Sequence, residues 1–376
     1  MITAARILQT KLKDLIPGHY HYHLDTTKFV TDNHVDIKIE YFSNLSYAKE
    51  DFHIFDLSDE PWREPLAEKL NEICERFKLQ SYLIFSHSLK YNYNPTFRNI
   101  IYMPHNYFDC VLGWNREVAL QSVDNNERQY FLSCLNRQPR VNRIYNFLKI
   151  IGKPYFNKML LSIHNLTDEN SVYNSKEEQY ISEWMEESMW DEWNRLAPTL
   201  PTTCTNDLDI EHPAYHNAYL NLVTETFIQP NELFLTEKIW KPIACGQMFL
   251  VLGPTGVLSY LNDIGFDTYN DIIDHDRYQH IPQWKARVAA IHELLDELYE
   301  LDWAKIYKET RLRRLSNARH FYSGLAVKPS MEYAAKRMSE IRGVPYTYDH
   351  HQILNIHNIR SPLYTGLYPI NHLFRN

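Results

Sequence analysis

LTEKIWKPIACGQMFLVLGPTG, residues 235–256, is the stretch of sequence that decides the fold class. Thr236 is a natural helix N-cap, so we expect a helix over 236–245. Residues 248–252 are all apolar, as in a buried strand. Pro242 removes one helical hydrogen bond, so it should kink or shorten the helix. A helix that leads directly into a buried strand indicates α/β architecture.

The same alternation of helices and strands continues on both sides of this stretch. The predicted strands are 82–85, 100–103, 130–134, 159–163, 219–223 and one that starts over 266–269. The predicted helices are 62–77, 139–148 with Pro139 in its first turn, 175–195, 257–264 and two long helices within 284–320. Short alternating units of this kind predict a parallel sheet with helices on both faces.

The expected fold class is therefore α/β, with two Rossmann-like domains facing across a cleft. We expect a boundary near residue 128, so that residues 1–128 form an N-terminal domain and residues 129–330 a C-terminal domain. Residues 331–376 form a C-terminal extension, which we expect to pack back on the N-terminal domain. Ligands of such sheets bind at the carboxyl ends of the strands, so the functional residues are expected there.

Composition excludes several classes of protein. The net charge of the 376 residues is −8, whereas a protein that simply coats nucleic acid is normally basic. The sequence contains no apolar run long enough to span a bilayer, and its start has no pattern of a secretory signal. Five widely spaced cysteines without a CxxC pair argue against a disulfide framework. We therefore expect a cytoplasmic protein, in the host cytoplasm if the chain is viral.

The helix start at Thr236 carries an acid and a base in its first turn. Free N–H groups and a partial positive charge at a helix N-terminus suit a phosphate, and Lys238 adds a full charge for a diphosphate. Glu237 can accept two hydrogen bonds from the vicinal hydroxyls of a ribose. The three residues are therefore a workable clamp for a nucleoside diphosphate. The alternative is an ordinary capped helix, in which an acidic first turn favours the helix dipole.

Three segments in order resemble the α1,3-fucosyltransferase family. Residues 235–256 resemble its donor-site region, in which Thr-Glu-Lys starts an amphipathic helix and an apolar strand ends in Gly-Pro or Gly-Ser. Residues 219–226 are similar to its strand ending in Glu-Asn-Ser, and residues 133–148 to its Ser-Asn loop and Arg-bearing helix. Residues 253–274 are also similar to glycosyltransferase-like proteins of bacteriophages. The resemblance covers residues 130–320 approximately. Residues 1–128 show no resemblance to a known family.

The resemblance implies a GT-B fold whose C-terminal domain binds a nucleotide sugar and whose N-terminal domain lies on the acceptor side. By matching motif, Glu237 would hold the ribose and Lys238 the diphosphate. Arginines at the start of the helix after the Asn loop would neutralise phosphate. The donor-binding candidates are Arg137, Arg140, Arg143, Glu225, Thr236, Glu237, Lys238 and Gly253. Thr226 stands where fucosyltransferases have Asn, which leaves the donor sugar and nucleobase open.

The expected function is transfer of a sugar from a nucleotide-diphosphate donor to a hydroxyl acceptor without a metal or other cofactor. The partners are then a nucleotide sugar and either a glycan or a hydroxymethylated base in phage DNA. A carboxylate or histidine must deprotonate the acceptor hydroxyl in an inverting transfer, and the candidates are His87, Asp59 and Glu60. The alternative is a binding module of the same fold that holds a nucleotide or glycan without turnover. A third reading is an assembly protein with a relic fold.

Two other patterns carry less weight. Asp207-Leu208-Asp209 has the Asp-X-Asp spacing of metal-dependent transferases, and His19, His21 and His23 alternate on one predicted strand face. Each is more simply a polar loop or an exposed strand, so we expect no metal site. The basic residues between Lys305 and Arg319, here called the basic segment, are the candidate DNA contact, although a solvated helix face is the simpler reading.

Overall fold

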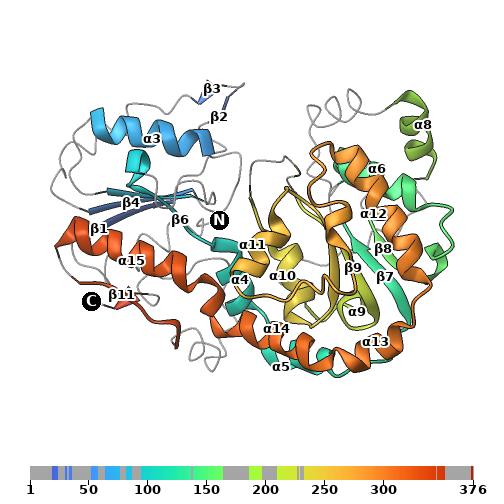
Figure 1. Cartoon of the computed structure of the whole chain (residues 1–376). Coiled ribbons are helices and arrows are strands. Elements are labelled where there is room, and N and C mark those ends of the chain that lie inside the picture. The colour runs from blue at the N-terminus through green and yellow to red at the C-terminus, as the bar shows by residue number, and fades with distance from the viewer. Residues whose placement is uncertain are drawn as a thin grey trace, which may run out of the picture. The chain divides into compact units, whose positions relative to one another are not determined.

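The structure is a computed structural model that describes residues 19–23, 30–31, 34–35, 52–57, 64–76, 82–86, 95–136, 139–163, 186–196, 210–226, 228, 233–343, 345–351 and 374–375. The chain divides into two units, one made of residues Met1–Leu112 and Ser323–Asn376 and the other of residues Gly113–Tyr322 (Figure 1). These divisions fall after residues 112 and 322, whereas the sequence analysis expected them after 128 and 330. The two units are called unit 1 and unit 2.

Unit 1 contains a parallel sheet whose strand order follows the chain. Its strands are β1 (His19–His23), β4 (Phe52–Leu57), β5 (Tyr82–Ser86) and β6 (Ile100–Tyr102). The predicted helix at 62–77 is confirmed as α3 (Glu64–Arg76), and the strands predicted at 82–85 and 100–103 are confirmed as β5 and β6. Figure 1 shows α3 on one face of the sheet and α15 (Lys328–Arg342) on the other. The helix from the C-terminal part of the chain therefore covers the face that α3 leaves open.

Smaller elements among the described residues of unit 1 include two pairs of short antiparallel strands and a helix that ends where the chain passes into unit 2. They are β2 (Val30–Thr31) with β3 (His34–Val35), β11 (Thr347–Tyr348) with β12 (Phe374–Arg375), and α4 (His105–Gly113). The guanidinium of Arg337 in α15 donates a hydrogen bond to the carbonyl of Arg98 at 3.0 Å. This bond ties α15 to the segment just before β6.

Unit 2 contains a second parallel sheet with a different strand order. Its strands are β7 (Tyr130–Leu135), β8 (Met159–Ser162), β9 (Ala218–Thr224) and β10 (Met248–Leu252), and their order across the sheet is β8-β7-β9-β10. All four predicted strands are confirmed. The chain first moves outward from β7 to β8 and then returns to the other side of β7 for β9. This reversal is the switch point of a doubly wound α/β sheet, beside which ligands bind.

The helices of unit 2 lie on both faces of this sheet. They are α5 (Arg116–Val123), α6 (Val141–Ile150), α8 (Glu187–Leu196), α9 (Pro213–His216), α10 (Glu237–Ala244), α11 (Val257–Asp263), α12 (Trp284–Tyr299), α13 (Trp303–Glu309) and α14 (Arg311–Ser323). Helix α12 packs beside α6, and α5 packs against both α9 and α10. The predicted helix at 175–195 is described only from residue 186, and its expected first turns lie outside the described residues.

Two neighbouring residues of β7 show which helices cover which face. The thiol of Cys134 accepts a hydrogen bond from the side chain of Asn146 in α6 at 3.7 Å. The hydroxyl of Ser133 accepts one from the side chain of Gln247 at 3.3 Å, and the same amide nitrogen donates to the carbonyl of Ala214 in α9 at 2.9 Å. Successive side chains of a strand point to opposite faces, so α6 and α9 lie on opposite faces of the sheet.

Helix α10 and strand β10 follow the prediction made from residues 235–256. Thr236 is the N-cap of α10, and its hydroxyl accepts a hydrogen bond from the backbone N–H of Lys238 at 3.3 Å. Pro242 lies inside the helix, which ends two residues later at Ala244. Every residue of β10 is buried, and Trp240 of α10 stacks on Phe321 with ring centroids 5.9 Å apart in the interior. The helix is therefore short, as the proline suggests, and its apolar side chains hold it against the sheet.

The C-terminal helices of unit 2 differ from the prediction. Residues 284–320 were expected to form two long helices, but they form three: α12, α13 and α14. The break before α13 lies at Asp302, whose carboxylate accepts a hydrogen bond from the N–H of Lys305 at 3.1 Å and so caps a new helix. Pro139 is a smaller correction, because it precedes the N-cap Arg140 of α6 and does not lie in the first turn.

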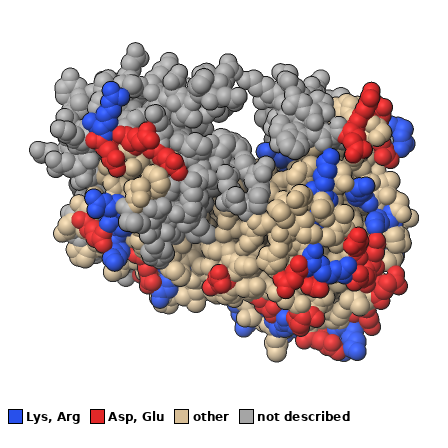
Figure 2. All heavy atoms as spheres, turned by 45° about the horizontal axis from the view of Figure 1, so that its top comes forward, with Lys and Arg blue, Asp and Glu red and all other residues tan. Residues whose placement is uncertain are grey.

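The basic segment is largely engaged in contacts within unit 2. Arg311 forms an ion pair with Asp124 at 2.5 Å, and Lys305 lies 4.0 Å from Glu309. Arg314 is fully buried and donates to the backbone carbonyls of Val123, Gly246 and Tyr307. On the described part of the face in Figure 2, basic and acidic side chains lie interspersed over unit 2. The segment is therefore not a continuous surface of one charge.

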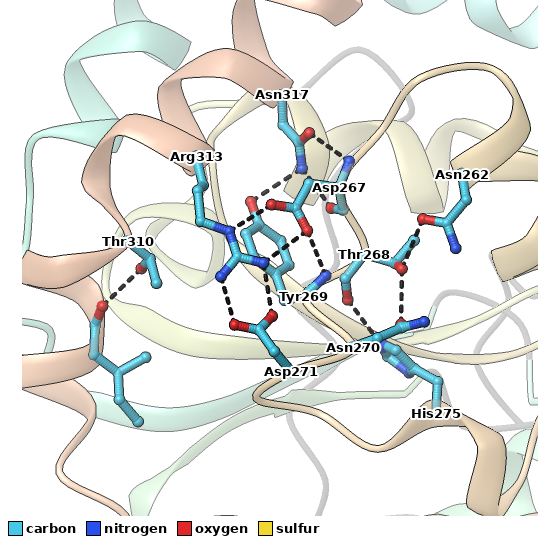
Figure 3. Close-up of polar contacts among 11 residues, drawn as sticks. Asn262, Asp267, Thr268, Tyr269, Asn270, Asp271, His275, Thr310, Arg313 and Asn317 are labelled. Atoms are coloured by element: carbon cyan, nitrogen blue, oxygen red, sulfur yellow. Dashed lines mark hydrogen bonds and ion pairs between the residues drawn. The ribbon is translucent and has the colours of Figure 1, made fainter.

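Residues 266–269 do not form the predicted strand. Figure 3 shows that side chains take the hydrogen bonds that a neighbouring strand would supply. The N–H of Asp267 donates to the side chain of Asn317 at 2.9 Å, and the N–H of Tyr269 donates to the carboxylate of Asp267 at 2.8 Å. Tyr269 also has a φ of 61°, in the left-handed region that no regular strand contains. The guanidinium of Arg313 lies between Asp267 and Asp271 and holds the turn in this form.

No helix in the part of the chain that the structure describes is long and apolar enough to cross a membrane.

Candidate functional site

Polar residues meet at the carboxyl ends of β7 and β9, on either side of the switch point. Thr224 is the last residue of β9, and its hydroxyl donates a hydrogen bond to the side-chain oxygen of Asn136, directly after β7. The guanidinium of Arg143 in α6 donates to the backbone carbonyl of Thr224 at 3.2 Å. All three side chains are buried. They connect β7, β9 and the start of α6 on the face of the sheet that α6 covers.

Glu225 follows Thr224 and turns the other way, toward the start of α10. Its side chain has no exposure to solvent, and both carboxylate oxygens accept hydrogen bonds from Thr236. The Thr236 hydroxyl lies 2.6 Å from one oxygen and the Thr236 N–H lies 3.3 Å from the other. Burial raises the pKa of Glu225, while the nearby Lys238 ammonium and the Thr236 hydrogen bonds act in the opposite direction. Glu225 thus links the end of β9 to the N-cap of α10.

Glu237 and Lys238 lie in the first turn of α10 and reach solvent. Their side chains are 17% and 22% exposed, and the ammonium of Lys238 donates to Glu237 at 2.7 Å and to the Thr236 hydroxyl at 3.2 Å. Burial alone would raise the pKa of Glu237, but the Lys238 ammonium, its hydrogen bond and the charge of Lys241 together lower that pKa below its ordinary value. An ionised acid and a cation are therefore held side by side at an exposed helix start.

Arg143 brings a second cation to the same edge. It is almost fully buried, and burial together with the like charge of Arg140 lowers its pKa to about 10, against the opposing charges of Glu237 and Glu225. A guanidinium with this pKa is still protonated at neutral pH. Arg140 is the N-cap residue of α6 and is partly exposed. The two helix starts, α6 and α10, therefore place positive charge on both sides of the switch point.

Gly253 lies at the end of β10, against Glu225. A Cβ atom at this position would lie 3.2 Å from Cγ of Glu225 and 3.0 Å from Cγ1 of Val251. The carbonyl of Gly253 accepts a hydrogen bond from the buried guanidinium of Arg287 in α12. Glycine therefore leaves room for the Glu225 side chain, and Arg287 fixes the turn that follows β10.

Sequence reasoning missed Arg287 and Asn142. An arginine in an amphipathic helix is usually exposed, so nothing in the local sequence marks Arg287 as buried. Asn142 lies in the first turn of α6, is 3% exposed, and its side-chain nitrogen has no hydrogen-bond partner. The position of Asn142 directly before Arg143 is the only local signal that could have drawn attention to it. A buried donor of this kind can be satisfied by an oxygen atom of a ligand.

The structure brings together Arg140, Arg143, Glu225, Thr236, Glu237, Lys238 and Gly253 at the carboxyl ends of β7, β9 and β10. The other candidates Arg137, His87, Asp59 and Glu60 lie outside the described residues, as does Asp207-Leu208-Asp209. Strand β1 contains His19, His21 and His23, of which only the backbone is described. Among the described residues, no group of three or more His, Cys, Asp or Glu side chains is placed to hold a metal ion.

Comparisons with protein-family models, with curated proteins and with solved structures find no match to this chain. The resemblance to α1,3-fucosyltransferases over about 130–320 therefore stays a prediction from the sequence. Function is inferred below from the chemistry that the residues at the carboxyl edge of unit 2 can perform.

Proposed function

We propose that the chain is a metal-independent glycosyltransferase that moves a sugar from a nucleotide-diphosphate donor to a hydroxyl acceptor. The observation that carries the proposal is the pair Glu237 and Lys238 at the partly exposed start of α10, beside the switch point of a doubly wound sheet. In this proposal unit 2 is the donor-binding domain of a GT-B-like enzyme and unit 1 its acceptor side.

Each residue of the carboxyl edge has a role in this proposal. The first-turn N–H groups of α10 and the Lys238 ammonium bind the diphosphate, and the ionised Glu237 accepts hydrogen bonds from ribose hydroxyls. Arg143, with Arg140 one turn earlier, supplies charge from α6. Asn142 offers its unpartnered side-chain nitrogen to a phosphate or sugar oxygen.

The chemistry needs countercharge on the leaving group. When the bond from the sugar to the diphosphate breaks, negative charge develops on the β-phosphate. Fixed cations and helix N–H groups that already point at this position stabilise the charge without reorganisation. Lys238, Arg143 and the start of α10 are groups of this kind. The acceptor hydroxyl must lose a proton, and His87, Asp59 and Glu60 of unit 1 remain the candidates for the base.

The contacts of the basic segment weaken the case for a DNA acceptor, so a glycan hydroxyl is the first acceptor to test. The sequence support for DNA was the basic segment, in which Arg311, Arg313 and Arg314 are held by groups of the protein itself. Arginines occupied in this way are less available to neutralise phosphates of a duplex. A hydroxymethylated base stays as the second acceptor to be tested.

The test is a binding and turnover screen with ADP, GDP, UDP, CDP and their sugar derivatives. A nucleotide at about 100 times its Kd should add about 2.7 kcal/mol of stability, which thermal unfolding detects readily. Glu237→Ala and Lys238→Ala should abolish this shift. The controls are Glu309→Ala and Lys305→Ala, which break another acid–base pair on α13.

Release of free sugar from the bound donor distinguishes the enzyme from a non-catalytic binding module. Binding with slow hydrolysis supports the enzyme, since water replaces the missing acceptor. Binding without any sugar release, even with glycan acceptors present, would favour the binding module. No stabilisation by any nucleotide would exclude the proposal.

A further inference from the structure

We infer that Glu225 is a positioning residue that aligns the first turn of α10 and the ammonium of Lys238 for the ligand of this edge. The inference rests on the proposed function for the identity of that ligand. Glu225 was listed from its motif as a donor-binding residue, but its side chain has no exposed surface. Both of its oxygens are already used by Thr236. Glu237, by contrast, reaches solvent and is available to a ligand.

The donor and the acceptor in each hydrogen bond of the Thr236 hydroxyl can be assigned. A threonine hydroxyl has one hydrogen to donate and two lone pairs that accept. Its hydrogen is committed to Glu225 at 2.6 Å, because a carboxylate only accepts. The lone pairs are then left for the N–H of Lys238 at 3.3 Å and its ammonium at 3.2 Å. Glu225 therefore determines, through one hydroxyl group, where the first turn of α10 and the charge of Lys238 lie.

The Glu225 side chain is held from a second direction by β10. Its backbone N–H donates to the carbonyl of Leu252 at 2.9 Å, and the bare Cα of Gly253 allows the close approach of its Cγ. The side chain is therefore fixed by the backbone on one side and by Thr236 on the other. A residue of this kind transmits the position of the sheet to the helix start.

Charged groups from two helices compensate the buried carboxylate. Lys238 of α10 and Arg143 of α6 are the opposite charges near it, while Glu237 of α10 is a like charge that opposes its ionisation. Burying a carboxylate is costly unless it is paired and hydrogen-bonded, so a purely structural link would be made more cheaply by a neutral side chain. A carboxyl group at this position therefore points to a role that needs its two oxygens, which is to hold the N–H and the hydroxyl of Thr236.

The variants that test this role are Glu225→Gln, Thr236→Val and Thr236→Ser in the full chain. Glutamine keeps the shape of Glu225 but offers only one acceptor, valine removes the hydroxyl, and serine retains it. The first readout is hydrogen exchange of the backbone amides of residues 234–245 without nucleotide. The second is the Kd of the nucleoside diphosphate that binds best among ADP, GDP, UDP and CDP.

Glu225→Gln and Thr236→Val should speed exchange at the start of α10 and weaken nucleotide binding about five-fold or more. Thr236→Ser keeps the hydroxyl, so its exchange and its nucleotide Kd should stay close to those of wild type. The pH profile separates positioning from general stability. A protonated Glu225 also offers only one acceptor, so the Kd values of wild type and Glu225→Gln should converge as pH falls through the raised pKa of Glu225. Glu237 titrates at lower pH, because its pKa is lowered.

Unchanged exchange over 234–245 in Glu225→Gln would overturn the inference whether or not a nucleotide binds. Faster exchange throughout unit 2 would also overturn it, since Glu225 would then support the fold in general. Localised faster exchange in a protein that binds none of the four nucleotides would instead overturn the proposed function and leave the positioning role standing.

Discussion

The two parallel sheets of the molecule have the same number of strands but different strand orders. In unit 1 the order β1-β4-β5-β6 follows the chain, so the described strands of this sheet show no reversal. In unit 2 the chain places β8 on one side of β7 and β9 on the other. Helix α6 therefore leaves the sheet toward one face, and α10 lies in the helix layer of the other face. Their starts lie at the ends of β7 and β9.

The two strand orders go with different surroundings for the buried polar groups at the carboxyl ends of the strands. Asn136, Thr224, Glu225 and Arg143 are buried together at the reversal in unit 2, where two helix starts supply N–H groups and charge. In unit 1 the last residue of β5, Ser86, is buried, and its carbonyl accepts the N–H of Met103 after the neighbouring strand. We therefore expect ligand affinity to depend on the stability of unit 2 and hardly at all on the stability of unit 1.

The largest effect should come from opening the core of one unit at a time. Trp240→Ala removes a buried ring between Phe266 and Phe321 in unit 2, and we expect a loss of about 3–5 kcal/mol. Leu83→Ala empties a comparable position in β5 of unit 1 and should cost about 2–5 kcal/mol. Urea unfolding followed by hydrogen exchange of each unit measures both losses.

Nucleotide affinity then tests the comparison. Leu83→Ala should leave the Kd within about two-fold of wild type, whereas Trp240→Ala should weaken binding together with the stability of unit 2. Equal weakening by both variants would mean that the two units do not bind and unfold independently. The comparison between the sheets would then fail.

Much of the sheet in unit 2 could be predicted from the sequence because its strands are buried on both faces. Such strands are apolar runs, as in 248–252 and, apart from Ser133, in 130–134, and they stand out from the amphipathic helices around them. The helix start at Thr236, with Glu237 and Lys238 in its first turn, was equally predictable, since helix caps depend on neighbours in sequence. Local signals of this kind need no knowledge of the remaining chain.

The rest depended on contacts between distant residues. The strand order that creates the reversal follows from which strands pair, and no local pattern encodes it. The predicted strand at 266–269 was wrong because Asn317, about 50 residues away, takes the N–H of Asp267. Glu225 was found only through its motif, and its burial against Thr236 needed the fold to bring β9 and α10 together.

A second prediction concerns acid and a buried histidine of unit 2. His275 is buried; its Nε2–H donates to the carbonyl of Thr268 at 2.8 Å and its Nδ1 accepts from the hydroxyl of Tyr278 at 2.7 Å. Burial lowers its pKa to about 4, so the ring is neutral in the folded state. Below pH ~6.5 His275 binds a proton in the unfolded chain but not in the folded protein. The free energy of unfolding should therefore decrease by about 3 kcal/mol as pH falls from ~6.5 to ~4.

The free energy of unfolding measured from pH 7.5 to 4.5 checks this prediction. His275→Gln should be less stable than wild type at pH 7.5, and the difference should shrink as pH falls. A wild-type advantage that stays constant with pH would contradict a neutral His275.

A smaller effect is expected from crowding Glu225. Gly253→Ala places a Cβ atom 3.2 Å from Cγ of Glu225, so the side chain must shift by a few tenths of an ångström. We expect nucleotide binding to weaken about three- to five-fold with a stability loss of about 1 kcal/mol. Gly343→Ala is the matched variant in unit 1, where φ is 67° and no atom lies near the added methyl group. It should cost about 1 kcal/mol through backbone strain and leave the nucleotide Kd unchanged.

The smallest effect should follow loss of the charge of Arg313. This variant tests whether Arg313 contacts only groups of the protein or also binds a ligand. Arg313 contacts Asp267 and Asp271 at 2.6 and 2.7 Å, but all three side chains are at least one-third exposed. Solvent screens such pairs, so Arg313→Gln should cost about 1 kcal/mol or less in urea unfolding.

DNA binding gives a second measurement on the same variant. Because the charge of Arg313 is already matched by two carboxylates, retention of a labelled DNA duplex at low salt should not change. A clear loss of duplex binding, with a shallower salt dependence, would show that the basic segment faces phosphates and would make DNA the acceptor to pursue. An unchanged result would agree with a basic segment whose arginines are held by carboxylates and carbonyls of unit 2 itself.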